Sequence, residues 1–191
     1  MISRTFRMTR SRLILLDANV VIQLFQLGIW EQITARCDIV LAQTVVDEVQ
    51  FYETDTGREY VDWDNWKSKC SMRVESLPAA DIQAYCAKFG PGYYEKLDPG
   101  EAEALALLVQ DDESKICSAD KIVWRVLGNT NATDRGVSLE EILAMSGLMK
   151  PLPARFTKAF REKWCRAGSV EGFMGQGDQT RRDGGSGRPS W

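Results

Sequence analysis

The chain has 191 residues, 44% of them apolar and 27% charged, which is enough to bury the core of a single domain. It contains no histidine, which excludes imidazole acid-base catalysis and catalytic zinc sites built on histidine, so any catalysis must come mainly from carboxylates. The five cysteines form no Cys-x-x-Cys pair, and we expect them to be reduced. The longest apolar run, residues 104–109, is too short to cross a membrane, which favours a cytoplasmic location.

Charge is distributed unevenly along the chain, although the net charge is only -3. Residues 1–12 carry four Arg and no acid, a basic N-terminal segment of +4, and residues 150–191 carry nine Lys or Arg against four acids, or +5. The remaining 11 bases and 23 acids give residues 13–149 a charge of -12. An acidic body with basic ends is typical of nucleic-acid enzymes, while solvated charge that keeps the protein soluble is an equally good explanation.

Short apolar runs alternate along the chain with segments of helical apolar spacing. In chain order, the expected elements are a strand (13–17), a helix (18–25), a strand (38–42), a helix (43–53), a strand or extended link (72–75), two helices (79–89 and 99–112), a strand (115–118) and three helices (120–127, 138–145 and 154–166). This alternation predicts an α/β domain over residues 13–149, with a short parallel sheet flanked by helices.

Two segments stand apart from this pattern. Residues 54–71 form a polar, aromatic insertion, in which Tyr60, Trp63 and Trp66 are expected to pack as a small core, with stacking on unpaired bases as the alternative. Residues 150–167 form a C-terminal helical extension, and the Gly-, Arg- and Ser-rich residues 168–191 are predicted to be a disordered tail.

Two acids stand at the ends of predicted strands. Asp17 closes the first strand and Asp120 directly follows the strand at 115–118. In a parallel sheet both lie at the carboxyl edge, where open α/β folds bind their ligands, so the two could lie side by side. Each could instead be only a helix N-cap, which for a single aspartate is the more frequent role.

Two glutamates occupy apolar faces of predicted helices. Glu101 belongs to a capping box that Asp98 opens, but it also shares a face with the apolar residues three, four and seven positions on, whereas Glu103 points the other way. A carboxylate on a core face is costly unless it is paired, hydrogen-bonded or bound to a metal. Glu48 lies at the edge of the apolar face of its helix, where a salt bridge is the ordinary alternative to a ligand role.

Four acids converging on one sheet edge would repel each other strongly unless cations neutralised them. Oxygen ligands without histidine or cysteine select Mg²⁺ or Mn²⁺ rather than zinc, and Mg²⁺ commonly shares its coordination with substrate phosphates. Such a cluster therefore predicts a magnesium or manganese site.

Four short motifs surround these acids in chain order, which are Leu-Leu-Asp17-Ala-Asn19, Val-Val-Asp-Glu48-Val, Gly-Glu101-Ala-Glu-Ala-Leu and Ser118-Ala-Asp120. In these motifs and their order, residues 13–147 resemble the PIN-domain family of VapC-like metal-dependent ribonucleases. The chain departs from the family's common pattern in having glutamate as the third acid, in the insertion at 54–71, and in lacking a clear further acid after Asp120 within its helix.

This resemblance implies a PIN-like three-layer sandwich and a Mg²⁺- or Mn²⁺-dependent endoribonuclease that cleaves RNA by in-line attack of water on phosphorus. It implies a catalytic, metal-binding centre of Asp17, Glu48, Glu101 and Asp120. Asn19 and Ser118 would be polar supports that orient carboxylates or waters. One or two cations are compatible with this set, with Glu48 holding a cation or orienting the water. The implied partners are RNA and, for a toxin of a toxin-antitoxin pair, a cognate antitoxin whose peptide covers the pocket; a homodimer is left open.

The competing hypothesis is a non-catalytic PIN-like module that binds nucleic acid or protein, in which the acids are caps and salt-bridge partners and the basic ends make the contacts. Three bases of the helix at 154–166 recur at three-residue spacing and can share one face, namely Arg155, Lys158 and Arg161. We expect this face to contact RNA more strongly than the tail does.

Overall fold

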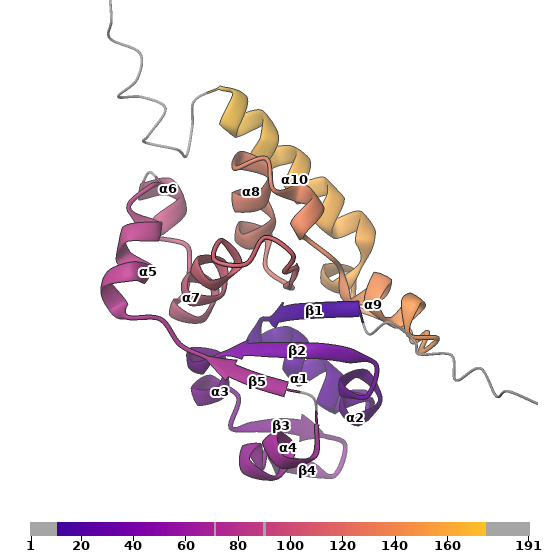
Figure 1. Ribbon diagram of the computed structural model, residues 1–191. Helices are drawn as coiled ribbons and strands as arrows, with labels where there is room; N and C mark the ends of the chain where they lie inside the picture. Colours follow the sequence, from indigo (N-terminus) through magenta and orange to yellow (C-terminus); the bar gives the residue numbers. More distant parts are fainter. Residues whose placement is uncertain (1–10, 71, 90, 175–191) are drawn as a thin grey trace, which may run out of the picture.

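The computed structural model describes residues 11–70, 72–89 and 91–174 (Figure 1). Four parallel strands form its main sheet in the order β5-β2-β1-β6. They are β1 (Ser11–Leu16), β2 (Cys37–Ala42), β5 (Met72–Glu75) and β6 (Ile116–Cys117). The predicted parallel sheet is confirmed, and β1 and β6 lie next to each other with Leu16 paired to Cys117.

Helices cover the sheet from both sides. They are α1 (Ala18–Gln26), α2 (Trp30–Thr34), α3 (Gln43–Glu48), α4 (Trp63–Lys69), α5 (Ala79–Cys86), α6 (Pro91–Tyr94), α7 (Pro99–Leu108), α8 (Lys121–Asn129), α9 (Leu139–Met145) and α10 (Lys158–Phe173). In Figure 1 the strands β1, β2 and β5 follow one another from top to bottom, with α4 beyond β5 and with α8 and α10 beyond β1. The chain first builds outward from β1 to β5 and then returns to β6, and right-handed crossovers of this kind place helices on both faces of a parallel sheet.

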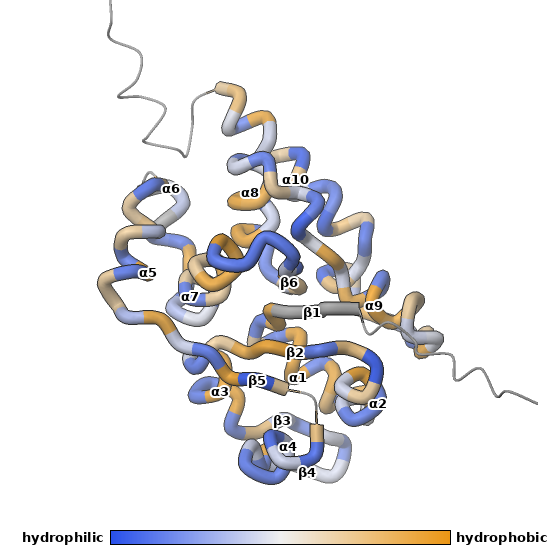
Figure 2. The backbone as a smooth tube through the Cα atoms, in the orientation of Figure 1, coloured by the Kyte–Doolittle hydropathy of each residue, from blue (hydrophilic) through white to orange (hydrophobic). Residues whose placement is uncertain are grey.

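The hydrophobic core lies between these layers. Apolar residues gather along β2 and α7 (Figure 2), and Leu41 and Leu105 on these two elements are fully buried. The helix α7 contacts β1, β2 and β6 as well as α3 and α5, so it is enclosed rather than laid on the surface. None of the described helices has the length and apolar character needed to span a membrane.

The predicted helix at 43–53 is wrong in its second half. The helix α3 ends at Glu48, and the chain continues as β3 (Phe51–Thr54), which pairs antiparallel with β4 (Gly57–Tyr60). Gly57, with a φ of 129°, closes the hairpin in a backbone conformation that other residues rarely adopt. Tyr52 continues the helical apolar spacing of α3 in the sequence, which is why a longer helix was predicted. In the structure Tyr52 lies on β3, and its ring stacks on Phe25 of α1 with 5.2 Å between the ring centroids.

Two of the three aromatic residues predicted to pack in the insertion do so, although not as a separate core, whereas the prediction is wrong for Tyr60, which lies on the hairpin strand β4 and is 76% exposed. Trp63 is buried and Trp66 half-buried, and both rings contact Phe25 and Trp30 of α1 and α2. The Trp63 indole also donates a hydrogen bond of 2.8 Å to the Val49 carbonyl. The insertion is therefore joined to the main core.

The C-terminal extension differs from its prediction at both ends. A 3₁₀ turn, η2 (Ala154–Phe156), stands where the helix was expected to begin, and extended backbone at Thr157 separates it from α10, which continues to Phe173. A Cβ on Gly128 would lie 2.0 Å from the Cys165 carbonyl, and one on Gly168 would lie 2.0 Å from the Arg125 carbonyl. These glycines let the backbones of α8 and α10 touch, so residues 168–173 belong to the fold. Residues 175–191 of the predicted tail and 1–10 of the basic N-terminal segment lie outside the described residues.

Candidate functional site

Asp17 lies at the carboxyl end of β1, beside the end of β6. Its Oδ1 accepts a hydrogen bond of 2.9 Å from the Val20 amide at the start of α1, and its Oδ2 accepts one of 2.8 Å from the Ala119 amide and one from the Ser118 hydroxyl. The capping role is confirmed, and the ends of β1 and β6, which both acids were expected to follow, lie side by side. Burial raises the pKa of Asp17, against the effect of these hydrogen bonds. The hydrogen bonds therefore fix the orientation of the Asp17 carboxylate, while burial makes its negative charge unfavourable.

Glu101 and Asp98 form the predicted capping box at the start of α7. Asp98 Oδ1 accepts from the Glu101 amide at 2.9 Å, and Glu101 Oε2 accepts from the Asp98 amide at 3.1 Å. Glu101 is only 6% exposed. Burial, followed by the charges of Asp98, Asp120 and Asp17, raises its pKa to about 8. A carboxyl group in this position is therefore largely protonated at neutral pH unless a cation compensates the surrounding charge.

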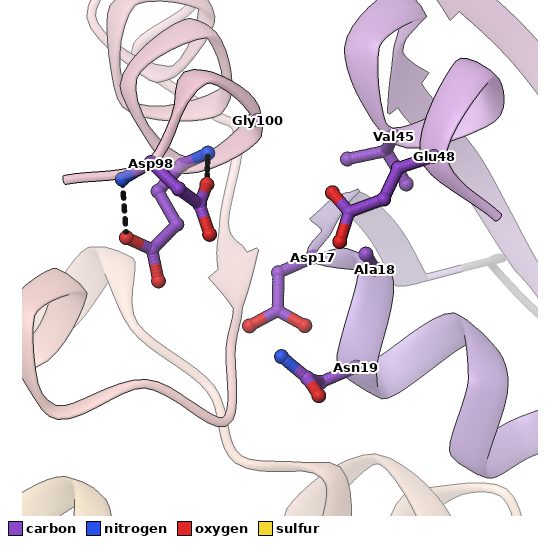
Figure 3. Close-up of a pocket in the computed structure, with 8 residues that line it drawn as sticks. Asp17, Ala18, Asn19, Val45, Glu48, Asp98 and Gly100 are labelled. Carbon is purple, nitrogen blue, oxygen red and sulfur yellow. Dashed lines mark hydrogen bonds between the residues drawn. The ribbon is translucent and has the colours of Figure 1, made fainter.

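Glu48, the last residue of α3, faces the start of α7. An ideal Cβ built on Gly100 would lie 3.7 Å from Glu48 Oε2, so the carboxylate borders the first turn of that helix. Burial, then the charges of Asp98 and Asp17, raise the pKa of Glu48. Figure 3 shows the carboxylates of Asp17 and Glu48 and the amide of Asn19 facing the same space, with Asp98 on its opposite side.

These groups line one pocket of about 240 Å³, which includes the part open to solvent. The lining residues are Asp17, Ala18, Asn19, Val45, Glu48, Asp98, Gly100 and Glu101. Three of the four predicted acids and Asn19 are thus brought together, and no lysine or arginine stands among the lining residues. Asp98 was assigned only a capping role from the sequence; its place in the same capping box as Glu101 was the signal that it would share Glu101's surroundings.

Asp120 is not among the residues that line the pocket. Its Oδ1 accepts from the Ile122 amide at 2.7 Å, which confirms it as the N-cap of α8. It lies close enough for its charge to raise the pKa of Glu101. Ser118 connects the two strand-end acids, since its hydroxyl donates to Asp17 and accepts from the Asp120 amide at 2.9 Å.

The expectation that Glu103 points away from the core is wrong. Glu103 is 2% exposed, and its Oε2 accepts hydrogen bonds from the Thr44 amide and hydroxyl, while its Oε1 accepts from the Leu77 amide at 3.0 Å. Burial raises its pKa, but these hydrogen bonds outweigh burial, so the net effect is a lowered pKa. The residue ties α7 to the start of α3 and to the segment after β5, a structural role that the helical periodicity did not indicate.

The expected basic face at the C-terminus is also not formed. Arg155 lies in η2, before the break at Thr157, and is therefore not on the helix that carries Lys158 and Arg161. Arg161 is 13% exposed and forms a two-pronged ion pair with Glu141 of α9, at 3.1 Å for each nitrogen. Arg155 and Lys158 are exposed, whereas Arg161 mainly anchors α10 to α9.

The side chains that line the pocket fit a divalent cation. Within residues 11–70, 72–89 and 91–174, no three acidic or cysteine side chains are already arranged as a metal-binding group. Mg²⁺ does not require such a group, because it commonly binds one or two carboxylates and completes its coordination with water and substrate phosphate. The pocket offers only oxygen donors, its carboxyl groups have raised pKa values and no lining residue is basic, and each of these features fits a hard divalent cation.

The chain matches no protein-family model, no curated protein and no solved structure.

Proposed function

We propose that the chain is a PIN-like, Mg²⁺- or Mn²⁺-dependent endoribonuclease. The observation that carries the proposal is the pocket beside the carboxyl end of β1, in which carboxylates from the N-cap of α1, from α3 and from the start of α7 gather without a basic residue. Its position agrees with the rule that open α/β sheets bind ligands outside the carboxyl ends of their strands, where the chain reverses its direction of crossover. The short motifs around the acids, similar to those of PIN-domain ribonucleases, support RNA as the substrate.

The residues of the chain have distinct tasks in this proposal. Asp17 would hold the cation, because hydrogen bonds from Ser118 and Ala119 fix its carboxylate. Glu101 and Glu48 would complete the cation-binding side of the pocket, with Asp120 adding negative charge beside Glu101. The exposed Asn19 amide can hydrogen-bond a phosphate oxygen or a water at the pocket mouth. When bound, the cation supplies Lewis-acid activation of water and neutralises phosphate charge.

The test is cleavage of a labelled single-stranded RNA. We expect cleavage with Mg²⁺ or Mn²⁺, none in EDTA, and no rescue by Ca²⁺, whose looser coordination positions water poorly. Asp17→Asn and Asp120→Asn should each remove most activity, and the double variant should be little worse than either, because such groups act as a unit. Asp62→Asn, a change in the N-cap of α4 outside the pocket, is the matched control and should retain activity. Cleavage that persists in EDTA would refute the proposal.

A non-catalytic PIN-like binding module is the second candidate. It is favoured by the capping roles of Asp17, Asp98 and Asp120, each of which gives the acid a structural reason to be present. On this hypothesis RNA is bound but not cleaved, and the binding does not change when Mn²⁺ is replaced by EDTA. For the nuclease, the resemblance further supports a cognate antitoxin, whose peptide would cover the acidic pocket with positive charge.

A further inference from the structure

Asp98 occupies two positions at once, as the N-cap of α7 and as a wall of the acidic pocket. Its Oδ1 accepts the Glu101 amide at 2.9 Å, which is sufficient to explain a cap. The carboxylate nevertheless lines the pocket, across from Glu48 (Figure 3). An ideal Cβ on Gly100 would lie 3.6 Å from Asp98 Oδ1 and 3.7 Å from Glu48 Oε2, so the two carboxylates border the same small space.

We propose that Asp98 is a further cation-binding carboxylate of this pocket, in addition to Asp17, Glu48 and Glu101. The inference rests on the proposed metal-dependent function. It makes the start of α7 a source of two acids, Asp98 from outside the helix and Glu101 from its first turn. The exposure of Asp98 leaves it accessible to a hydrated ion or a phosphate-bound one.

The composition of the pocket lining supports this placement. The carboxylates of Asp98, Asp17, Glu48 and Glu101 all line one pocket, and no lysine or arginine is among its lining residues. A cap needs only a short acceptor, and serine or asparagine would serve as well. An aspartate adds repulsion among the acids that line the pocket, which makes its charge unfavourable for the cation-free fold and favourable for cation binding.

The experiment separates the charge of Asp98 from its cap. Asp98→Asn and Asp98→Ser both keep a capping oxygen and remove the charge. Asp62→Asn makes the same chemical change at the N-cap of α4, where the Asp62 side chain accepts from the Asn65 amide at 3.0 Å outside the pocket. Titration calorimetry with MnCl₂ on the full-length protein measures the affinity for Mn²⁺. The melting temperature in EDTA shows whether the N-cap of α7 is retained.

We expect both Asp98 variants to bind Mn²⁺ about ten- to a hundredfold more weakly than wild type, the range for removing one polar group that supports a metal. Their melting temperatures in EDTA should be at or above that of wild type, and Asp62→Asn should bind Mn²⁺ as wild type does. If the unmodified chain binds Mn²⁺ measurably and Asp98→Asn binds it with the same affinity, the inference is overturned and the proposed function still stands. An unmodified chain that binds no Mn²⁺ would overturn both.

Discussion

Glu101 and Glu103 are two residues apart on α7, both nearly fully buried, and we predict that the same Glu→Gln change has opposite effects at the two positions. The pKa of Glu101 is raised from 4.5 to about 8, because burial and neighbouring acids disfavour its charge. Keeping such a group in the fold at pH 7 costs about 3 kcal/mol relative to the unfolded chain, at 1.36 kcal/mol per pKa unit. Glutamine keeps the capping-box acceptor for the Asp98 amide and cannot ionise. We therefore expect Glu101→Gln to stabilise the cation-free protein by about 1–3 kcal/mol at pH 7.

Glu103 has the reverse balance, because its charge is satisfied by hydrogen bonds. Glutamine offers one acceptor oxygen, so its NH₂ group would face either the Thr44 or the Leu77 amide, and a buried donor would lose its partner. Leaving such a group unpaired costs about 1–3 kcal/mol. We therefore expect Glu103→Gln to be destabilising by about that amount.

The pH dependence also has opposite signs at the two positions. An acid whose pKa is raised in the fold binds more protons folded than unfolded, so the wild-type stability that Glu101 controls falls as pH rises from about 4.5 to 8. The advantage of Glu101→Gln should be small at pH 5 and largest above pH 8. The pKa of Glu103 is lowered, so its contribution is present above the unfolded value and is lost on acidification, and the penalty of Glu103→Gln should shrink towards low pH.

The assay is urea unfolding at pH 5, 6, 7 and 8 in EDTA, with Glu31→Gln, exposed on α2, as the control. Changes of equal sign and size at positions 101 and 103 would refute the reasoning from their surroundings. Added Mn²⁺ should stabilise wild type more than Glu101→Gln, because a ligand that binds only the folded state stabilises in proportion to its affinity.

Two further predictions follow from the packing of α10. Gly128→Ala and Gly168→Ala should each lower the free energy of unfolding by about 3 kcal/mol or more, because the added Cβ would meet the backbone of the facing helix. The control Gly92→Ala, which has open space around it, should cause no loss of stability. Equal melting temperatures for all three variants would show that α8 and α10 do not touch. Arg161→Gln should lower the free energy of unfolding by about 2 kcal/mol, because the ion pair with Glu141 is lost. Arg155→Gln, at an exposed position, should change the melting temperature little and should weaken RNA binding if the basic end contacts RNA. A larger loss of melting temperature for Arg155→Gln than for Arg161→Gln would contradict the anchoring role of Arg161.

The sequence by itself determined those features that depend on near neighbours in the chain. Apolar runs located the four parallel strands, and the capping residues Asp17 and Asp98 marked helix starts where the structure has them. The order of strands and helices determined the parallel sheet. Because β1 and β6 carry their acids just past their last residues, that order also indicated that Asp17 would meet the end of β6. The assignment of these acids to a metal-dependent nuclease stays a prediction.

Only the tertiary structure decided which faces are covered and how closely elements approach. Periodicity shows that one side of α7 is apolar, but not that α3 and α5 cover its other side, and therefore it misplaced Glu103 at the surface. In the same way, local spacing placed Tyr52 on a helix, because Tyr52 continues the apolar spacing of Val45 and Val49, whereas in the structure it lies on β3 with its ring against Phe25. Gly168 is a flexible tail residue by composition, yet it is a contact residue once Arg125 lies against it. In each case the deciding partner is distant in sequence, and burial against such a partner outweighs local preference.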